Sequence, residues 1–201
     1  MRLRFSEAAV LIAAAMGLIY AFGLAVLFET HLTFYNAVVS LTAPISHSLE
    51  IFVPSIKSTA RRAIEMGVQP TFYVNLSAMI WAISLVFGII GIIQIPIMIS
   101  NYRKQMQTGR EQSVPLGRWQ ISNNFYGWTM LAWAIGFSFA CYFFLVGPDL
   151  FTKIGDVWKP NLKMIIAFCV LAPSLILGPC NMIALLVAQK SATRNRLPVE
   201  Y

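Results

Sequence analysis

Residues 66 to 102 carry no charged side chain, and this run limits the possible folds more than any other feature of the chain. As a helix that rises about 1.5 Å per residue, the run is longer than the ~30 Å hydrocarbon core of a bilayer, so only part of it needs to cross. Pro70 suits a first helical turn, and Arg103 and Lys104 follow the apolar part. The sequence therefore predicts a transmembrane helix over 71–99.

The composition of the whole chain agrees with a membrane protein. Apolar residues make up 58% of the chain and charged residues 11%, against about 25% charged residues in an ordinary soluble domain. The formal net charge is +7, but most basic residues stand at the ends of apolar runs and are not interleaved with aromatic residues. They indicate membrane topology and contact with anionic phospholipid, and we expect no nucleic acid as a partner.

Three further runs without charged residues predict three more transmembrane helices. The four predicted helices cover 8–28, 71–99, 125–146 and 164–189. They are joined by an outer connection over 29–70, an inner loop over 100–124 and an outer loop over 147–163, and an inner tail follows over 190–201. The first run is longer than the ~7–15-residue apolar region of a signal peptide, so we expect a retained helix. The chain is then a single membrane domain over 1–201.

The outer connection is expected to contain an amphipathic helix over 54–66. Pro54 fits the first turn of this helix and Gly67 its end, while Pro44 is expected to start a separate segment upstream. Its apolar and basic side chains fall on different faces, as in helices that lie at a membrane interface. The predicted fold class is therefore all-α integral membrane, with four transmembrane helices and an outer interfacial amphipathic helix.

The distribution of basic residues predicts the orientation of the chain. Nine Lys or Arg residues fall on the side of the N-terminus, the 100–124 loop and the tail, and six fall on the other side. Since basic residues are enriched on the cytoplasmic side, we expect both termini in the cytoplasm and the chain in the cell (inner) membrane.

Small side chains recur on one face of each predicted transmembrane helix, where the backbones of two helices can approach closely. The predicted packing residues are Gly17, Ala21, Ser77, Ser84, Gly88, Gly91, Ala132, Gly136, Ala140, Ser174, Gly178 and Asn181. Such stripes fit packing within one chain and also contact with another subunit, and the sequence leaves both open.

Prolines predict breaks in the second and fourth transmembrane helices. Pro96 leaves one backbone carbonyl without its helical donor, and Gln94 is a nearby candidate for replacing that donor. Pro173 and Pro179 have the same effect in the fourth helix. In transporters, freed carbonyls at broken helices line the substrate path.

The predicted transmembrane helices contain no Asp, Glu, Lys, Arg or His between their ends. Proton pumps and ion carriers place ionisable groups there, and haem held between helices needs ligands such as His there. His31 and His47, with Glu29 and Glu50, lie in the outer connection, but this set matches no metal-ligand or catalytic motif. We therefore predict no catalytic residue, no metal and no cofactor, and we identify no small-molecule substrate.

The leading hypothesis is a non-catalytic multi-pass subunit, a scaffold that packs on other integral membrane subunits and on phospholipid within a larger complex. The alternative is a small transporter or channel component, with a path lined by the broken second and fourth helices. An enzyme that uses the histidines of the outer connection is the least favoured hypothesis.

Overall fold

The computed structural model describes residues 5–111, 117–154 and 157–194. Within these residues the elements are α1 (Phe5–Thr30), α2 (Leu32–Phe52), α3 (Pro54–Glu65), α4 (Pro70–Ile93), α5 (Ile95–Glu111), α6 (Gly117–Leu145), β1 (Phe151–Ile154), β2 (Val157–Pro160), α7 (Leu162–Leu171) and α8 (Ser174–Arg194). The fold is thus almost entirely helical.

Three helical segments are long and apolar enough to cross a membrane: Ala8–Thr30, Pro70–Ile93 and Leu162–Ser191. Helices α2 and α3 pass the same test only as a pair, with a bend of 108° between them. The part of the chain that the structure describes therefore has three candidate spans, or four if the bent pair is counted as one.

The predicted third span over 125–146 falls on α6. The described apolar part of that helix, Met130–Leu145, is shorter than the other candidate spans. Helix α6 itself begins earlier, at Gly117, and α5 continues to Glu111, so most of the segment predicted as an inner loop is helical. A polar segment can form a helix, because Gln, Lys, Arg and Met are good helix formers.

The two connections predicted on the other side also contain regular structure. Helix α2 continues through Pro44, which was expected to start a new segment. A proline removes one backbone hydrogen bond, and the helix can continue on both sides of it. In the predicted outer loop, β1 and β2 form an antiparallel hairpin in which Phe151 pairs with Pro160 and Ile154 with Val157.

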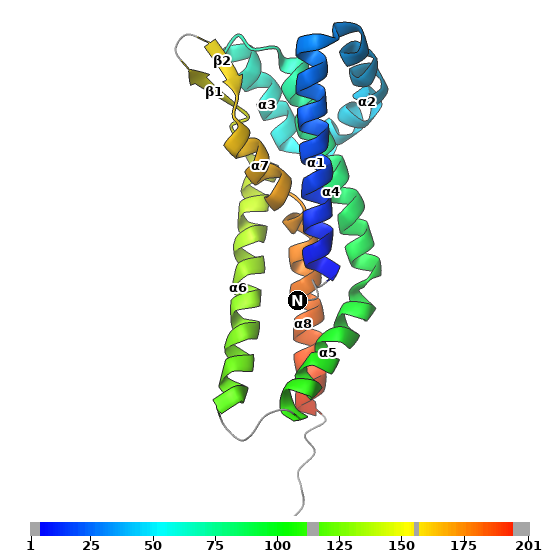
Figure 1. Ribbon diagram of the computed structural model, residues 1–201, viewed down its shortest axis with the longest axis vertical. Coiled ribbons are helices and arrows are strands. Elements are labelled where there is room, and N and C mark those ends of the chain that lie inside the picture. Colours follow the sequence, from blue (N-terminus) through cyan, green and yellow to red (C-terminus); the bar gives the residue numbers. More distant parts are fainter. Residues whose placement is uncertain (1–4, 112–116, 155–156, 195–201) are drawn as a thin grey trace, which may run out of the picture.

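Helices α1, α4, α6 and α8 run along the long axis of the molecule (Figure 1). Helices α2 and α3 and the β-hairpin gather at one end, which we call the hairpin end. Helix α5 and the C-terminal part of α8 lie at the opposite end.

The helices stop at different levels near the hairpin end. The ring of Phe28, close to the end of α1, lies 5.7 Å from the ring of Phe72 near the start of α4. The ring of Phe144, at the end of α6, lies 5.6 Å from the ring of Trp81. Positions 72 and 81 are separated by about 14 Å along α4. Helix α6 thus ends before α1 does along the long axis. The hairpin and α7 lie above the end of α6 and occupy the space beyond it (Figure 1).

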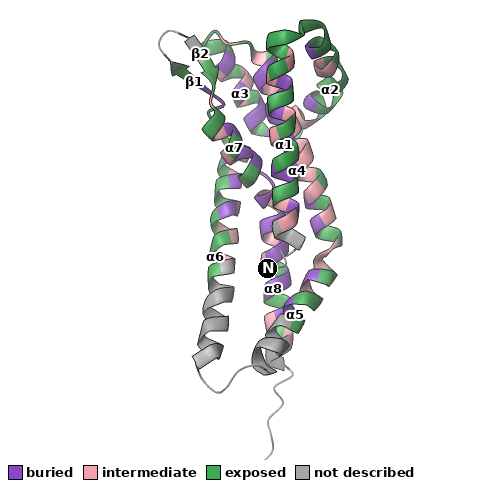
Figure 2. Cartoon of the chain, in the orientation of Figure 1, coloured by how far each residue is buried: buried purple, intermediate pink, exposed green. Residues whose placement is uncertain are grey.

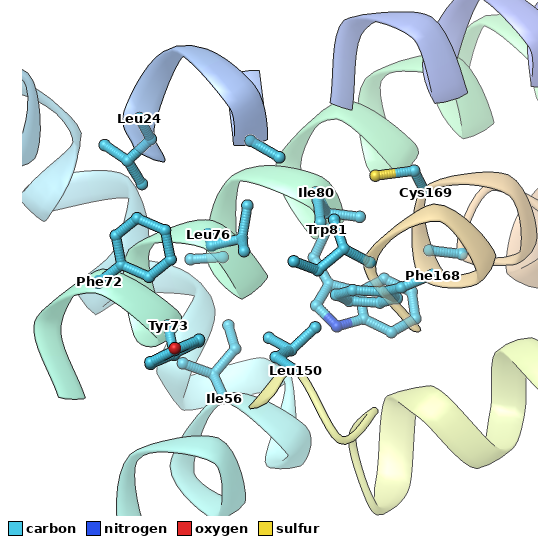
Figure 3. Close-up of a cluster of buried hydrophobic side chains, with 14 of the residues drawn as sticks. Leu24, Ile56, Phe72, Tyr73, Leu76, Ile80, Trp81, Leu150, Phe168 and Cys169 are labelled. Atoms are coloured by element: carbon cyan, nitrogen blue, oxygen red, sulfur yellow. The ribbon is translucent and has the colours of Figure 1, made fainter. Parts of the chain in front are cut away.

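The core lies beside the end of α6. Trp81 is only 1% exposed, and its ring packs 5.4 Å from the ring of Phe168 in α7. Figure 3 shows the two rings together, with Leu150 and Ile80 close by. Buried residues concentrate where helices face one another, and exposed residues cover their outer sides (Figure 2). In a bilayer such contacts stabilise the bundle through close packing, because lipid tails are as apolar as the side chains.

Candidate functional site

The predicted glycines lie where helices of this chain approach one another closely. A Cβ on Gly88 of α4 would lie 2.6 Å from Cδ1 and 2.8 Å from Cβ of Ile176 in α8. A Cβ on Gly91, about one turn further, would meet the side chain of Leu177. These positions are far inside van der Waals contact, so α4 and α8 can pack as they do only because both residues lack a side chain.

Other pairs of helices pack in the same way. A Cβ on Gly17 of α1 would lie 2.9 Å from Sγ of Cys169 in α7. A Cβ on Gly136 of α6 would lie 3.1 Å from Oγ of Ser174 in α8, and Gly178 of α8 lies against α6 in return. Close backbone approach therefore joins α1 to α7 and α6 to α8.

The remaining predicted packing residues are buried, with one exception. The buried ones are Ala21, Ser77, Ser84, Ala140, Ser174 and Asn181. Ala132 is exposed, so the stripe on α6 packs through Gly136 and Ala140. The Ser77 hydroxyl has no hydrogen-bond partner among the described residues. Because the contacts described above join helices of one chain, another subunit would have to bind to other surfaces.

The two predicted breaks in the second span lie close together. Gln94 separates α4 from α5, and its backbone N–H donates to the carbonyls of Ile90 and Gly91 over 3.1 and 3.2 Å. Pro96 falls in the first turn of α5, where backbone N–H groups have no helical partner in any case. The Gln94 side chain makes no hydrogen bond with another described residue.

The two prolines of the last span differ from each other. Pro173 falls between α7 and α8, whereas Pro179 lies inside α8, which continues past it. Pro179 is therefore not a helix break, since the loss of one backbone hydrogen bond leaves the helix intact on both sides.

Asn181, a predicted packing residue on the fourth helix that would also line the alternative transport path, is bonded inside the chain. The Tyr102 hydroxyl of α5 donates to its Oδ1 over 3.1 Å, and its Nδ2 donates to the Leu177 carbonyl over 2.8 Å. The side chain is 2% exposed. Its Oδ1 thus links α8 to α5, while its Nδ2 is bonded within α8.

A second polar cluster joins α2 to the bundle. The Tyr20 hydroxyl of α1 donates to Oδ1 of Asn75 in α4, and the Asn75 Nδ2 donates to the Thr42 Oγ1 in α2 over 2.5 Å. The Thr42 hydroxyl in turn donates to the Val38 carbonyl over 2.9 Å. Asn75 is 2% exposed, so this cluster is a buried link between three helices.

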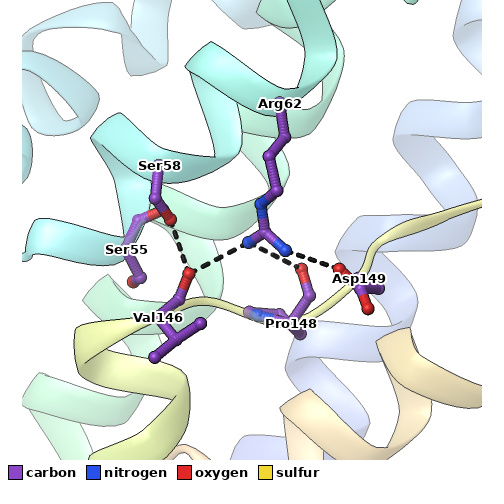
Figure 4. Close-up of polar contacts among 6 residues, drawn as sticks. All are labelled: Ser55, Ser58, Arg62, Val146, Pro148 and Asp149. Atoms are coloured by element: carbon purple, nitrogen blue, oxygen red, sulfur yellow. Dashed lines mark hydrogen bonds and ion pairs between the residues drawn. The ribbon is translucent and has the colours of Figure 1, made fainter. Parts of the chain in front are cut away.

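Helix α3 is fastened by its own polar contacts. The Trp81 Nε1 donates to the Ser55 Oγ over 3.1 Å. Further along α3, Arg62 forms an ion pair with Asp149 and donates to the Val146 carbonyl over 3.0 Å, and the Ser58 hydroxyl donates to the same carbonyl over 2.6 Å (Figure 4). A cation at a helix C-terminus is favourable, so Arg62 caps α6.

Sequence reasoning missed the role of Arg62. Residues 62 and 149 are 87 positions apart, and neither belongs to a motif. Only the fold brings α3 to the end of α6.

Several cavities lie near the hairpin end. The first has a volume of about 410 Å³ and is bounded by α1, the start of α4 and β2; we call it the aromatic cavity. Its lining residues are Ala25, Phe28, Glu29, Val68, Gln69, Phe72, Tyr73, Lys159 and Pro160. A second, of about 300 Å³, lies between α2 and α4, and a third, of about 500 Å³, includes Lys57 of α3; both are lined in part by His47 and Glu50.

The histidines of the predicted outer connection do not come together. His31 precedes α2 and His47 lies within it, about 24 Å further along a regular helix. The His47 Nδ1 lies 3.6 Å from the Glu50 Oε2, and the His47 side chain is 89% exposed. Among the described residues, no group of three or more His, Cys, Asp or Glu could hold a metal ion.

In comparisons with known proteins, no family model, no curated protein and no solved structure matches this chain.

Proposed function

We propose that this protein is a non-catalytic multi-pass subunit of a larger complex in the cell membrane. Its hairpin end would face outward and both termini would face the cytoplasm, as the excess of basic residues at the other end favours. The spanning helices would pack on one another through their small residues, and partner subunits would bind elsewhere.

The exposed face of α2 carries this proposal. Tyr35 and Ser46 are its buried residues. Large apolar side chains are exposed along it, with Leu41 at 79%, Ile51 at 74% and Phe52 at 73%. Polar residues are exposed beside them, namely Asn36, Ser40, His47 and Ser48.

Such a mixed face is well covered neither by lipid nor by water. Hydrocarbon tails leave the amide and imidazole groups without hydrogen-bond partners, and water leaves the large apolar side chains solvated. A protein surface can match both kinds of group at once, with an apolar centre and a polar rim. A partner subunit therefore fits the exposed face of α2 better than lipid alone.

The proposal is tested by gentle solubilisation of native membranes followed by sizing of the protein-bearing particle. We expect a particle that contains further polypeptides, identified by mass spectrometry, and is clearly larger than one 22.4 kDa chain in its detergent shell. A stable monomer that keeps the cellular function of the protein would contradict the proposal.

The transport alternative stays a prediction. Its broken-helix site would use Gln94 and Asn181, and the Asn181 amide is already engaged by Tyr102 and by a carbonyl of α8. Solute flux into liposomes that contain the purified protein, abolished by Asn181→Leu, would support transport over a scaffold role.

A further inference from the structure

The aromatic cavity has the size and walls of a ligand site. Its volume of about 410 Å³ lies within the ~300–1,000 Å³ typical of small-molecule sites. The Phe28 and Phe72 rings lie 5.7 Å apart, and the Phe72 and Tyr73 rings 5.0 Å apart. The cavity therefore presents a mainly apolar, aromatic wall formed by α1 and α4.

Three polar side chains line the same cavity and have no polar partner among the described residues. Glu29 ends the apolar run of α1, Gln69 precedes α4, and Lys159 belongs to β2. The side chains of all three make no hydrogen bond or ion pair with another described residue. One acid, one base and one amide are thus available to a ligand that enters the cavity.

The position of the cavity along the helices suggests where its ligand comes from. Glu29 and Gln69 lie next to the ends of the candidate spans Ala8–Thr30 and Pro70–Ile93. In a membrane protein, charged residues at these ends lie at the level of the lipid headgroups. A phospholipid is therefore the molecule whose polar part lies beside the cavity and whose acyl chains run along the apolar helices below it.

We propose that the aromatic cavity binds the headgroup of a zwitterionic phospholipid with a primary ammonium group, of the phosphatidylethanolamine type. The ammonium group donates to the Glu29 carboxylate and the Gln69 amide oxygen, and the phosphate accepts from the Lys159 ammonium. The glycerol and upper acyl carbons pack on Phe28 and Phe72. This site is separate from the exposed face of α2 and does not depend on the proposed complex.

The charges of the cavity select among common headgroups. An anionic phosphatidylglycerol would meet Lys159 but would also be repelled by Glu29. A phosphatidylcholine has the same net charge as phosphatidylethanolamine, but its quaternary ammonium has no N–H to donate to Glu29 or Gln69. Hydrogen bonds in which one partner is ionised are the stronger ones, so their loss is expected to weaken binding about tenfold.

The test uses the full-length protein, delipidated and returned to nanodiscs of neutral matrix lipid that contain one spin-labelled phospholipid at a time. We expect phosphatidylethanolamine to bind about tenfold more tightly than phosphatidylcholine or phosphatidylglycerol. Glu29→Gln and Lys159→Gln should each remove most of this preference. Glu65→Gln and Lys163→Gln, which change exposed residues of the same types outside the cavity lining, should leave it unchanged.

Binding of phosphatidylcholine or phosphatidylglycerol as tight as that of phosphatidylethanolamine would overturn the assignment. An unchanged preference in both cavity variants would overturn it as well. Water-soluble glycerophosphoethanolamine could also compete at a concentration similar to that of phosphatidylethanolamine. That result would assign the site to a free headgroup and contradict a lipid ligand. Glu29 and Lys159 are both exposed, so both variants are expected to fold. Melting curves in detergent check this.

Discussion

Helices α1 and α2 are neighbours at the hairpin end, yet they present different outer faces. Every exposed residue of α1 from Leu11 to Val26 is apolar. The exposed face of α2 mixes large apolar residues such as Ile51 with polar ones such as His47. Overall hydropathy is compatible with a membrane location for both helices. From the composition of the exposed faces we propose that lipid covers α1 and a protein covers α2.

The two helices also differ in how they are attached to the bundle. Helix α1 packs closely on α7 through Gly17, where nothing larger fits. Helix α2 is linked to α4 by the hydrogen bond between Asn75 and Thr42, and it continues through a sharp bend into α3, which Arg62 fastens to the end of α6. Substitutions at these points should therefore affect the two helices differently.

The largest effect is expected from Gly17→Leu. Already a Cβ at this position would lie 2.9 Å from Sγ of Cys169, so the larger side chain forces α1 away from α7. Overpacking of this kind costs about 3 kcal/mol of unfolding free energy. Thermal or denaturant unfolding in detergent measures the loss.

Gly23→Leu is the matched control for this prediction. Gly23 lies on the same helix, and a Cβ added there would have no neighbouring atom within 4 Å. The unfolding free energy of this variant should change by less than about 1 kcal/mol. If both variants lose the same stability, close approach of α1 to α7 is not what holds α1.

A smaller effect is expected from Asn75→Ala, which removes the link between α1, α4 and α2. Each buried hydrogen bond in a membrane protein contributes about 0.6 kcal/mol, and two are lost. Helix α2 should loosen more than α1, because α1 loses its bond from Tyr20 but keeps its close packing on α7 through Gly17. Hydrogen exchange measured on the α2 and α1 peptides reports this, with faster exchange expected in α2; faster exchange confined to α1 would contradict the described attachment.

The smallest effect on stability is expected from the ion pair of Arg62. The Asp149 side chain is 72% exposed, so water screens the pair, and a double-mutant cycle of Arg62→Gln with Asp149→Asn should give a coupling below about 1 kcal/mol. Arg62→Gln alone should cost more than the coupling, because the hydrogen bond to the Val146 carbonyl is also lost. If the cost of Arg62→Gln equals the coupling free energy, the cap on α6 contributes nothing to stability.

Local sequence signals were sufficient for part of this fold. The predicted helix over 54–66 ends within one residue of α3, because Pro54 begins it and Gly67, with a φ of 67°, follows its end. The start of α4 at Pro70 was predicted for the same reason. Prolines and glycines at helix ends act on the neighbouring backbone alone, so the sequence reveals their effect.

Other features depend on contacts between distant parts of the chain. The single helix through Pro44 is held against α4 by the bond from Asn75 to Thr42, which no periodicity indicates. The aromatic cavity combines Glu29 of α1 with Lys159 of β2. Because the folded arrangement of helices brings these residues together, neither the cavity nor the cap of α6 by Arg62 was foreseen from spacing.

The central claim is that α2 faces a protein and α1 faces lipid, and photo-crosslinking in intact native membranes tests it directly. A photoreactive residue is placed at Ile51 of α2 or at Ile19 of α1, two positions of almost equal exposure, 74% and 73%. We predict discrete protein adducts from position 51 and none from position 19. The claim would be contradicted by protein adducts from position 19 alone. It would also be contradicted if neither position gave a protein adduct.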